Sequence, residues 1–154
     1  MRLVIQRVLA ASVSVSGETI SAIDQGLLVL AGVTHSDTDA VARQMADKLV
    51  GLRLFEDADQ RMNLSVTDVG GAVLCVSQFT LYGDTRRGRR PSFDGAAPAP
   101  VARPVYETLC NEITSLGVRC ERGVFGAEMQ VSLINDGPVT LLLDSAELGR
   151  PRRT

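Results

Sequence analysis

The sequence predicts an α+β fold, in which a mostly antiparallel and barrel-like sheet carries two main helices packed on it. Short apolar runs bounded by turn residues recur along the chain, as expected of strands. Only two segments repeat apolar residues with the spacing of a helix. The expected strands cluster instead of alternating with helices, and this order favours an antiparallel sheet with helices on one side.

Four short strands are expected before the first helix, because apolar residues there are separated by turn residues at short intervals. Most of these runs alternate apolar and polar side chains, but the last is apolar throughout, which predicts a strand buried on both faces. The predicted strands span residues 2–9, 12–15, 19–23 and 27–33.

The first helix is predicted from apolar residues that recur every four positions between Val41 and Leu49. Ser36 or Asp37 is the expected N-cap, since short polar side chains accept hydrogen bonds from the first free N–H groups of a helix. Gly51 is the expected end of this helix.

The middle of the chain is expected to hold a short strand at 52–55, a polar loop at 56–65 and a buried strand at 72–76. The buried strand leads directly into residues 77–80, whose side chains are chemically diverse. Residues 83–100 are rich in glycine, arginine and proline, a composition that predicts a long loop.

The second helix is predicted to start near Pro100 or Val101 and to stop before Gly117. This start places Pro104 in the first turn, where a missing N–H is tolerated. Further strands are expected from Val118, Ala127 and Val139.

The stretch Asn135-Asp136-Gly137-Pro138-Val139-Thr140 joins the last two apolar runs. Pro138 cannot donate to a sheet ladder, and Gly137, without a Cβ, allows close approach of a ligand or another chain. A Gly-Pro bond is also one at which a cis peptide costs little. From the residues alone, we expect a tight turn between two strands.

Length and composition indicate one ordinary globular domain, since 154 residues suffice for a sizeable core and 45% of them are hydrophobic. We expect the domain to span residues 1–145 and a polar, basic tail to span 146–154. The longest apolar run, 26–33, is too short to cross a bilayer. Residues 1–7 lack the apolar region and cleavage site of a signal peptide, which favours a cytoplasmic protein.

Cys75, Cys110 and Cys120 are odd in number, and this favours free thiols in a reducing cytoplasm over a disulfide framework. No spacing of cysteine and histidine resembles a metal site.

Arginines gather in two places although the net charge of the chain is −2. Lys48 is the only lysine, and arginine suits phosphate contacts better than lysine does. A solvated loop and a frayed tail explain the two clusters equally well. The first cluster holds Arg86, Arg87, Arg89 and Arg90, and the second holds Arg150, Arg152 and Arg153.

The chain offers few groups that could activate a nucleophile. His35 lies in a polar segment, and Lys48 lies near the end of the first predicted helix, so neither is expected to act as a catalytic base. No glycine-rich phosphate loop is present. An enzyme with this sequence therefore needs a substrate that is already reactive or that supplies its own catalytic group.

Two stretches, Ser77-Gln78-Phe79-Thr80-Leu81-Tyr82-Gly83-Asp84 and 135–140, resemble the motifs of one family. The family is that of the bacterial-type D-aminoacyl-tRNA deacylases, also called D-tyrosyl-tRNA deacylases. The resemblance runs from Met1 to about Ser145. Collinear matches lie at Gln6-Arg7-Val8, 26–30, Met62-Asn63-Leu64-Ser65, Arg90-Pro91-Ser92-Phe93 and Phe125-Gly126-Ala127.

The resemblance implies a homodimer of small barrel-like subunits that needs no cofactor. It also implies that the Gly137–Pro138 peptide is cis and reaches into the pocket of the other subunit. There it would leave room for the hydrogen of a D-amino acid but not for an L side chain, a rejection that requires no contact with the accepted side chain. Glycine would not be excluded in this way. Arg7 is expected to support the geometry of this motif.

The reaction implied by the resemblance is hydrolysis of the ester that joins a D-amino acid to the 3′-terminal adenosine of tRNA. The expected oxyanion donors are the backbone N–H groups near Phe79 and Thr80. We expect the 2′-hydroxyl of the ribose to assist the attacking water, and Thr80 as a nucleophile is the rival hypothesis. The expected catalytic residues are Ser77, Gln78, Phe79 and Thr80, and the expected substrate-binding residues are Gly137, Pro138, Arg7, Met129 and Phe93.

Other interpretations stay open at this point. The chain could be a non-catalytic module that binds RNA ends, or an enzyme for free D-amino-acid esters. Arg86 to Arg90 and Phe93 are candidates for contact with the tRNA acceptor end, and packing at a dimer interface is the alternative for them.

Overall fold

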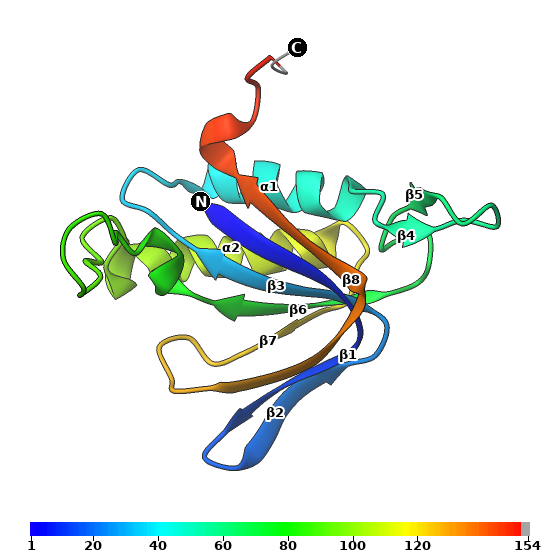
Figure 1. Ribbon diagram of the computed structural model, residues 1–154, viewed down its shortest axis with the longest axis horizontal. Helices are drawn as coiled ribbons and strands as arrows, with labels where there is room; N and C mark the ends of the chain where they lie inside the picture. The colour runs from blue at the N-terminus through cyan, green and yellow to red at the C-terminus, as the bar shows by residue number, and fades with distance from the viewer. Residues whose placement is uncertain (152–154) are drawn as a thin grey trace.

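The computed structural model describes residues 1–151, so Arg152 and Arg153 of the predicted tail lie outside the described residues. Two helices, α1 (Asp39–Gly51) and α2 (Ala99–Ser115), cover one side of a sheet (Figure 1). The strands of this sheet are β1 (Arg2–Val15), β2 (Glu18–Ile23), β3 (Gly26–Gly32), β6 (Ala72–Ser77), β7 (Cys120–Arg122) and β8 (Gln130–Asp144). The remaining elements are the strands β4 (Phe55–Glu56) and β5 (Met62–Leu64) and the 3₁₀ helices η1 (Phe79–Tyr82) and η2 (Ser145–Glu147).

The sheet is mixed, so the prediction of a mostly antiparallel sheet is wrong. Its strand order is β2-β1-β3-β6-β7, with β8 on the other side of β1. The strand β1 runs antiparallel to β2, β3 and β8, but β6 runs parallel to both β3 and β7. The reason is that α1 follows β3 and α2 follows β6, and a helix allows the chain to return in the same direction.

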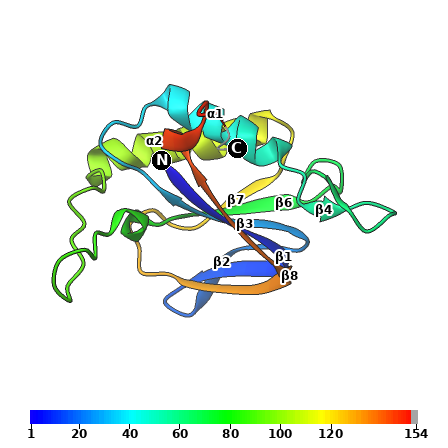
Figure 2. The same ribbon diagram turned by 45° about the horizontal axis from the view of Figure 1, so that its top comes forward.

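The strand β1 curls the sheet into part of a barrel. Its first half pairs with β3 as far as Val8↔Gly26, and its second half pairs with β2 from Ala11↔Ile23. The two strands predicted at 2–9 and 12–15 are therefore one bent strand. In Figure 2, β2 and the lower part of β8 lie apart from β3 and β6. The Ser21 hydroxyl on β2 donates to the Arg122 carbonyl on β7 at 2.7 Å, which links the two edges of the curl.

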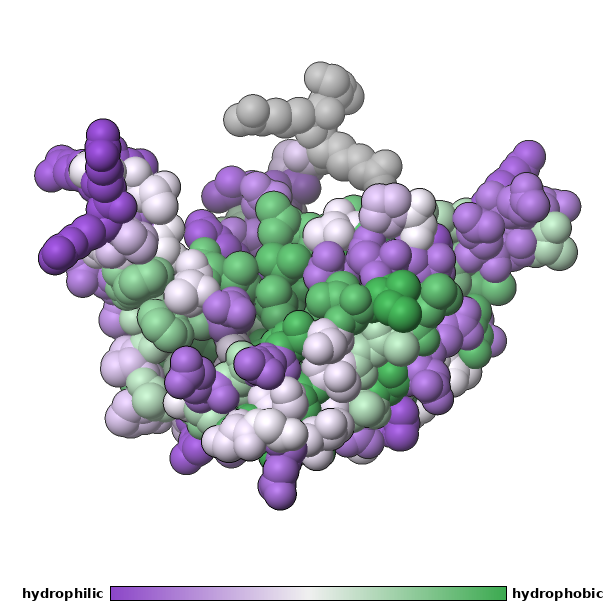
Figure 3. All heavy atoms as spheres, turned by 60° about the horizontal axis from the view of Figure 1, so that its bottom comes forward, coloured by the Kyte–Doolittle hydropathy of each residue, from purple (hydrophilic) through white to green (hydrophobic). Residues whose placement is uncertain are grey.

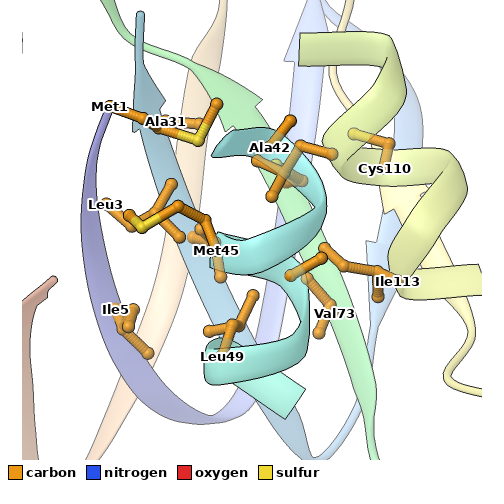
Figure 4. Packing of buried hydrophobic residues seen from close by; sticks show 14 of the residues in the cluster. Met1, Leu3, Ile5, Ala31, Ala42, Met45, Leu49, Val73, Cys110 and Ile113 are labelled. Carbon is orange, nitrogen blue, oxygen red and sulfur yellow. The ribbon is translucent and has the colours of Figure 1, made fainter. Parts of the chain in front are cut away.

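The curl creates two apolar cores. One lies between the sheet and the helices, where Met45, Leu49 and Ile113 pack toward Leu3 and Val73 (Figure 4). The other lies inside the curl and is formed by side chains such as those of Val8, Val13, Ile23, Leu28 and Leu74. Because β3 and β6 lie between the two cores, both faces of these strands are buried, as their continuous apolar runs predict.

Both helices start at other residues than predicted, whereas α1 ends at Gly51 and α2 stops before Gly117, as predicted. Thr38, not Ser36 or Asp37, caps α1, because its hydroxyl accepts from Val41 N at 3.3 Å. The Asp37 carboxylate accepts from Thr34 N at 2.8 Å instead, which stabilises the preceding turn. Pro104 lies inside α2 and not in its first turn, because the helix already begins at Ala99.

Two further segments test the predictions between the helices. The segment 56–65, predicted to be a loop, contains most of a small hairpin in which Phe55 on β4 faces Leu64 on β5. The segment 83–100 is loop up to the start of α2, as predicted. Within residues 1–151, no helix is long and apolar enough to span a bilayer.

Gly26→Ala is expected to lower the free energy of unfolding by at least about 2 kcal/mol, because overpacking of a close backbone contact forces strands apart. A Cβ at Gly26 would overlap the Ala72 carbonyl oxygen across the β3–β6 pair. Gly51→Ala is the matched control: nothing lies within 4 Å of its added Cβ, and it ends α1. The control is expected to be about 0.5 kcal/mol more stable than the wild type. Urea unfolding at one protein concentration measures both, and equal midpoints for the two variants would contradict the prediction.

Candidate active site

A cavity of about 560 Å³ lies at the carboxyl end of β6. Its size is within the range of sites that bind small molecules. The cavity exists because much of its wall consists of small side chains, those of Ala31, Ala96, Ala97, Ala102 and Ala127 among them. Five of the nine predicted site residues line it: Ser77, Gln78, Phe79, Phe93 and Met129.

The first motif forms the transition from β6 to η1. Gln78 N makes the last hydrogen bond between this segment and β3, because it donates to Ala31 O at 2.8 Å. The chain then turns into η1, and within residues 1–151 the N–H groups of Phe79 and Thr80 have no hydrogen-bond acceptor. Free N–H groups at a helix start are available to an anionic or carbonyl oxygen. Two donors of the kind an oxyanion site needs thus lie beside the cavity.

Thr80 lies outside the cavity lining, and its side chain is exposed. Its hydroxyl accepts a hydrogen bond from the Gln78 side-chain amide, a group that cannot remove a proton. His35 instead donates from Nε2 to the Asp94 carbonyl at 2.7 Å, and Lys48 lies in the last turn of α1. The described contacts of Thr80 therefore supply no base that would make it a nucleophile.

Two aromatic rings form one wall of the cavity mouth. The rings of Phe79 and Phe93 meet edge to face, with centroids 5.2 Å apart and planes at 73°. A Cβ on Gly83 would lie only 3.1 Å from the Phe93 ring, so the glycine allows this ring to pack closely against η1. Phe79 is 58% exposed, and an exposed aromatic face suits stacking with a nucleobase.

The floor of the cavity contains a tyrosine that was not singled out from the sequence. The Tyr106 hydroxyl donates to the Cys75 carbonyl at 2.8 Å, and its ring packs beside Phe125 with centroids 5.7 Å apart. Burial is the main cause that raises the pKa of Tyr106 above the usual value of a phenol, so the hydroxyl stays protonated. In the sequence, Tyr106 looks like one more member of the apolar stripe of α2, and no local signal separates it from core residues.

Three free thiols lie near this floor. Cys75 and Cys110 are buried, and Cys120 is half-buried. A hydrogen bond with Cys110 and burial raise the pKa of Cys75, which keeps its thiol protonated at neutral pH. Within residues 1–151, no group of three or more histidine, cysteine or acidic side chains could hold a metal ion.

The second motif is not a turn between two strands, so that prediction is wrong. Residues 130–134 of β8 pair with the second half of β1, and residues 140–144 pair with the first half of the same strand. Between Asn135↔Val8 and Thr140↔Gln6, β8 advances five residues while β1 advances two. Residues 136–139 therefore protrude as a bulge from one continuous strand.

The bulge is closed by the side chain of Asn135. Its amide nitrogen donates to Val139 O at 3.0 Å and to Arg7 O at 3.3 Å, and its oxygen accepts from Val139 N at 3.1 Å. The Gly137–Pro138 peptide is cis, as the resemblance implies. Gly137 has φ +125°, a conformation that favours glycine.

Arg7 on β1 supports the bulge through its guanidinium, and it does not line the cavity. It is only 5% exposed, and its guanidinium donates to Asp136 O at 3.1 Å and to Leu54 O at 2.7 Å. It also pairs with the Asp136 carboxylate at 3.2 Å. A Cβ on Gly137 would lie 2.9 Å from the Arg7 Nη2 atom, so the glycine leaves space for the guanidinium.

Removing this support in an Arg7→Ala variant is expected to lower the free energy of unfolding by about 2 kcal/mol or more, since it leaves the carbonyl of the buried Leu54 without its side-chain donor. Arg43→Ala is the control, because Arg43 pairs with Glu112 at the surface, at 3.9 Å. The control is expected to change stability by less than about 1 kcal/mol. Urea unfolding distinguishes the two, and a tolerated Arg7→Ala would contradict the supporting role.

One chain does not bring the bulge and the cavity together. The bulge lies beside Val8, which pairs with Gly26, and Gly26 pairs with Ala72 at the start of β6. The cavity lies beyond Ser77, at the end of the same strand. The five residue steps from Ala72 to Ser77 along β6 span roughly 16 Å, so the bulge and the cavity lie about this far apart along the sheet. Gly137 and Pro138 can therefore act in a cavity of this kind only if it belongs to another chain.

Comparisons with known proteins identify the family of this chain. The family model described as "D-Tyr-tRNA(Tyr) deacylase" matches residues 4–144. Relatives named D-aminoacyl-tRNA deacylase include one from Koribacter versatilis, 59% identical over 145 residues, which cover 94% of this chain and 97% of that protein. Another, from Thermus aquaticus, is 57% identical over 147 residues, which cover 96% of this chain and 97% of that protein.

Solved structures are similar as well. One named c-Myc DNA Unwinding Element Binding Protein is 41% identical, with a TM-score of 0.88 over 94% of this chain and 98% of that one. One described as a probable eukaryotic D-amino acid tRNA deacylase is 17% identical, with a TM-score of 0.79 over 92% of this chain and 97% of that one, and it shows the shared fold. The family match and the close relatives span nearly the whole chain, and this chain therefore belongs to the D-aminoacyl-tRNA deacylase family.

Proposed function

We infer that this protein hydrolyses the ester bond of D-aminoacyl-tRNA and releases the free D-amino acid and the tRNA. The observation that carries this inference is family membership over residues 4–144, a span that includes both motifs. The cavity beside the first motif supports it, because it combines free N–H donors, an exposed aromatic ring and enough volume for a small ligand.

The chemistry follows from what the site holds and what the substrate supplies. Water attacks the acyl carbon, the carbonyl oxygen becomes an oxyanion, and the N–H groups of Phe79 and Thr80 stabilise its charge. The tetrahedral intermediate then expels the 3′-oxygen of the ribose. The neighbouring 2′-hydroxyl relays a proton from the attacking water to this departing oxygen, so no protein base is required.

The remaining cavity residues position the substrate. Ser77 and Gln78 hold the terminal ribose and ester through their polar side chains, and Phe79 stacks against the adenine. Met129 packs against the core inside the curl, and together with Phe93 it forms an apolar wall of the cavity that can contact the nucleoside.

A homodimer completes the site. β8 is an edge strand, and the apolar side chains on both sides of its bulge face solvent in a single chain: Leu142 is 80% exposed and Ile134 57%. Leu9, Leu133 and Leu141 are exposed as well. Figure 3 shows apolar surface extending across one face of the molecule between polar projections. A patch of this kind indicates a protein interface, and an isologous dimer would bury it on both chains.

In this dimer, Gly137 and Pro138 of one chain enter the cavity of the other and select the D configuration. The bulge presents backbone atoms next to the substrate Cα, where a D-amino acid has hydrogen and an L-amino acid has its side chain. Rejection by steric clash leaves the identity of the D side chain free. Glycine has no side chain to clash, so glycyl-tRNA mischarged on a non-cognate tRNA is a further substrate. The cytoplasm, where aminoacyl-tRNA is found, is the proposed location.

The activity is tested by incubating the protein with D-tyrosyl-tRNA and measuring the release of D-tyrosine. Rapid release is expected. Binding of the tRNA without release would favour the non-catalytic RNA-end module, and equal turnover of a simple D-tyrosine ester would favour an enzyme for free esters. Light scattering tests the dimer separately, and a monomer at the assay concentration would contradict the shared site.

A further inference from the structure

The loop between η1 and α2 concentrates positive charge. Residues 84–94 contain four arginines and only two aspartates, in a chain whose net charge is −2. The arginine side chains are all exposed. We call Arg86, Arg87, Arg89 and Arg90 the arginine loop.

The base of this loop is held by hydrogen bonds. Asp84 and Ser92 form a two-way backbone bridge, with N···O distances of 2.7 and 2.9 Å. Thr34 donates from Oγ1 to Gly95 O at 2.7 Å, and His35 donates to Asp94 O, so the end of the loop is attached to the connection before α1. The residues between 84 and 92 therefore project from a stable base.

Only one arginine of the loop is neutralised. Arg86 binds the Asp84 carboxylate through Nη2 at 2.6 Å and through Nε at 2.9 and 3.1 Å. This contact holds the pKa of Asp84 at about 2, so the carboxylate is charged and already occupied. Within residues 1–151, no acidic side chain pairs with Arg87, Arg89 or Arg90. Three guanidinium groups remain available to an external anion.

The loop rises from the wall of the cavity. Phe93 follows the arginines directly, lines the cavity and packs against Phe79. In Figure 1 the loop extends beyond η1, away from the sheet. Figure 3 is turned about the horizontal axis, so the left side of Figure 1 stays on the left, and there polar side chains project beside the apolar face. A polymer whose end enters the cavity would therefore pass along this loop.

We propose that Arg87, Arg89 and Arg90 bind the phosphate backbone of the tRNA acceptor strand while the cavity holds the terminal adenosine. The identity of the ligand rests on the proposed function. The chemistry rests on the loop itself, because the planar guanidinium binds two phosphate oxygens at once and the three arginines lie close together in sequence, as the successive phosphates of a single strand do. Contacts to phosphate carry no sequence information, so the loop serves tRNAs of different sequence alike.

The test compares wild-type protein with the variant R87Q/R89Q/R90Q on two substrates, D-tyrosyl-tRNA and the D-tyrosyl ester of adenosine, which has no phosphate. On tRNA at low salt, kcat/KM is expected to fall at least about tenfold. The slope of log kcat/KM against log salt is expected to become shallower by roughly 2, since each lost phosphate contact removes about 0.7 for a single strand. The adenosine ester is expected to react with the variant as with the wild type.

The variant R43Q/R53Q/R61Q is the matched control, because it removes the same charge from exposed side chains on α1 and around the β4–β5 hairpin. Its salt slope is expected to equal that of the wild type. An equal loss in the control, an equal loss on the adenosine ester, or a changed mass in light scattering would overturn the proposal; the last result would place the loop at the subunit interface.

Binding of deacylated tRNA separates this proposal from the proposed function. If the wild type binds tRNA but hydrolyses nothing, and the loop variant weakens this binding with a shallower salt slope, the loop assignment stands and the enzymatic function fails. If hydrolysis is rapid but tRNA binding and its salt slope are unchanged in the variant, the function stands and the loop assignment fails.

Discussion

A tRNA that ends in 2′-deoxyadenosine and carries D-tyrosine on its 3′-oxygen is expected to be hydrolysed at least about 100-fold more slowly than the normal substrate. The reason is that the described contacts of Thr80 include no base, so the proton relay is assigned to the 2′-hydroxyl. Proton transfer by a positioned group contributes roughly 10²–10⁴-fold to a rate. Single-turnover release of D-tyrosine from the two substrates measures the effect.

Thr80→Val is the matched change on the protein side, because it removes the hydroxyl and keeps the size of the side chain. It is expected to lower the rate less than about tenfold, the loss of a single hydrogen bond to Gln78. A Thr80→Val protein that folds but retains less than about a hundredth of the activity, together with a reactive 2′-deoxy substrate, would instead identify Thr80 as the nucleophile.

Gly137→Ala is expected to reduce kcat/KM for D-tyrosyl-tRNA at least about 100-fold, since displacement of a positioning group by about 1 Å can have this effect. The added Cβ would lie 2.8 Å from Val139 Cγ2 and 2.9 Å from Arg7 Nη2, and the φ of +125° disfavours alanine. The bulge must therefore shift, and with it the backbone atoms that we propose to face the substrate in a partner's cavity.

Gly117→Ala controls for the backbone effect alone. Gly117 has φ +90° after α2, and nothing lies within 4 Å of its added Cβ. It is expected to lose about 1 kcal/mol of stability from backbone strain and to keep its activity. Steady-state kinetics and urea unfolding on both variants separate the outcomes. Normal kinetics in Gly137→Ala would show that the bulge does not contact the substrate.

Much of the candidate site follows from local sequence. The continuous apolar run before Ser77 identifies a buried strand, and the polar residues after it must then lie where that strand ends. The same reasoning identifies both faces of β3 as buried. In these segments the local pattern and the final packing agree, and prediction succeeds for this reason.

The failures all depend on contacts between distant residues. The runs on either side of Gly137 look like two strands joined by a turn, and only their pairing with β1 shows one bulged strand. Asp37 has the composition of an N-cap, but its carboxylate binds the ammonium group of Met1, 36 residues away in the sequence, at 2.7 Å. Tyr106 looks like a core residue of α2, and only the position of Cys75 on β6 shows that its hydroxyl has a partner at the cavity floor. No local pattern contains this information.

The most direct test of the account compares the wild-type protein on D-tyrosyl-tRNA and L-tyrosyl-tRNA, with loss of each ester corrected for spontaneous hydrolysis. Exclusion of the L side chain by the bulge predicts that the D ester is hydrolysed at least about 100-fold faster, the level that steric and polar discrimination reaches in selective enzymes. Comparable loss of both esters would contradict the role proposed for Gly137 and Pro138, and loss of neither would contradict the enzymatic function.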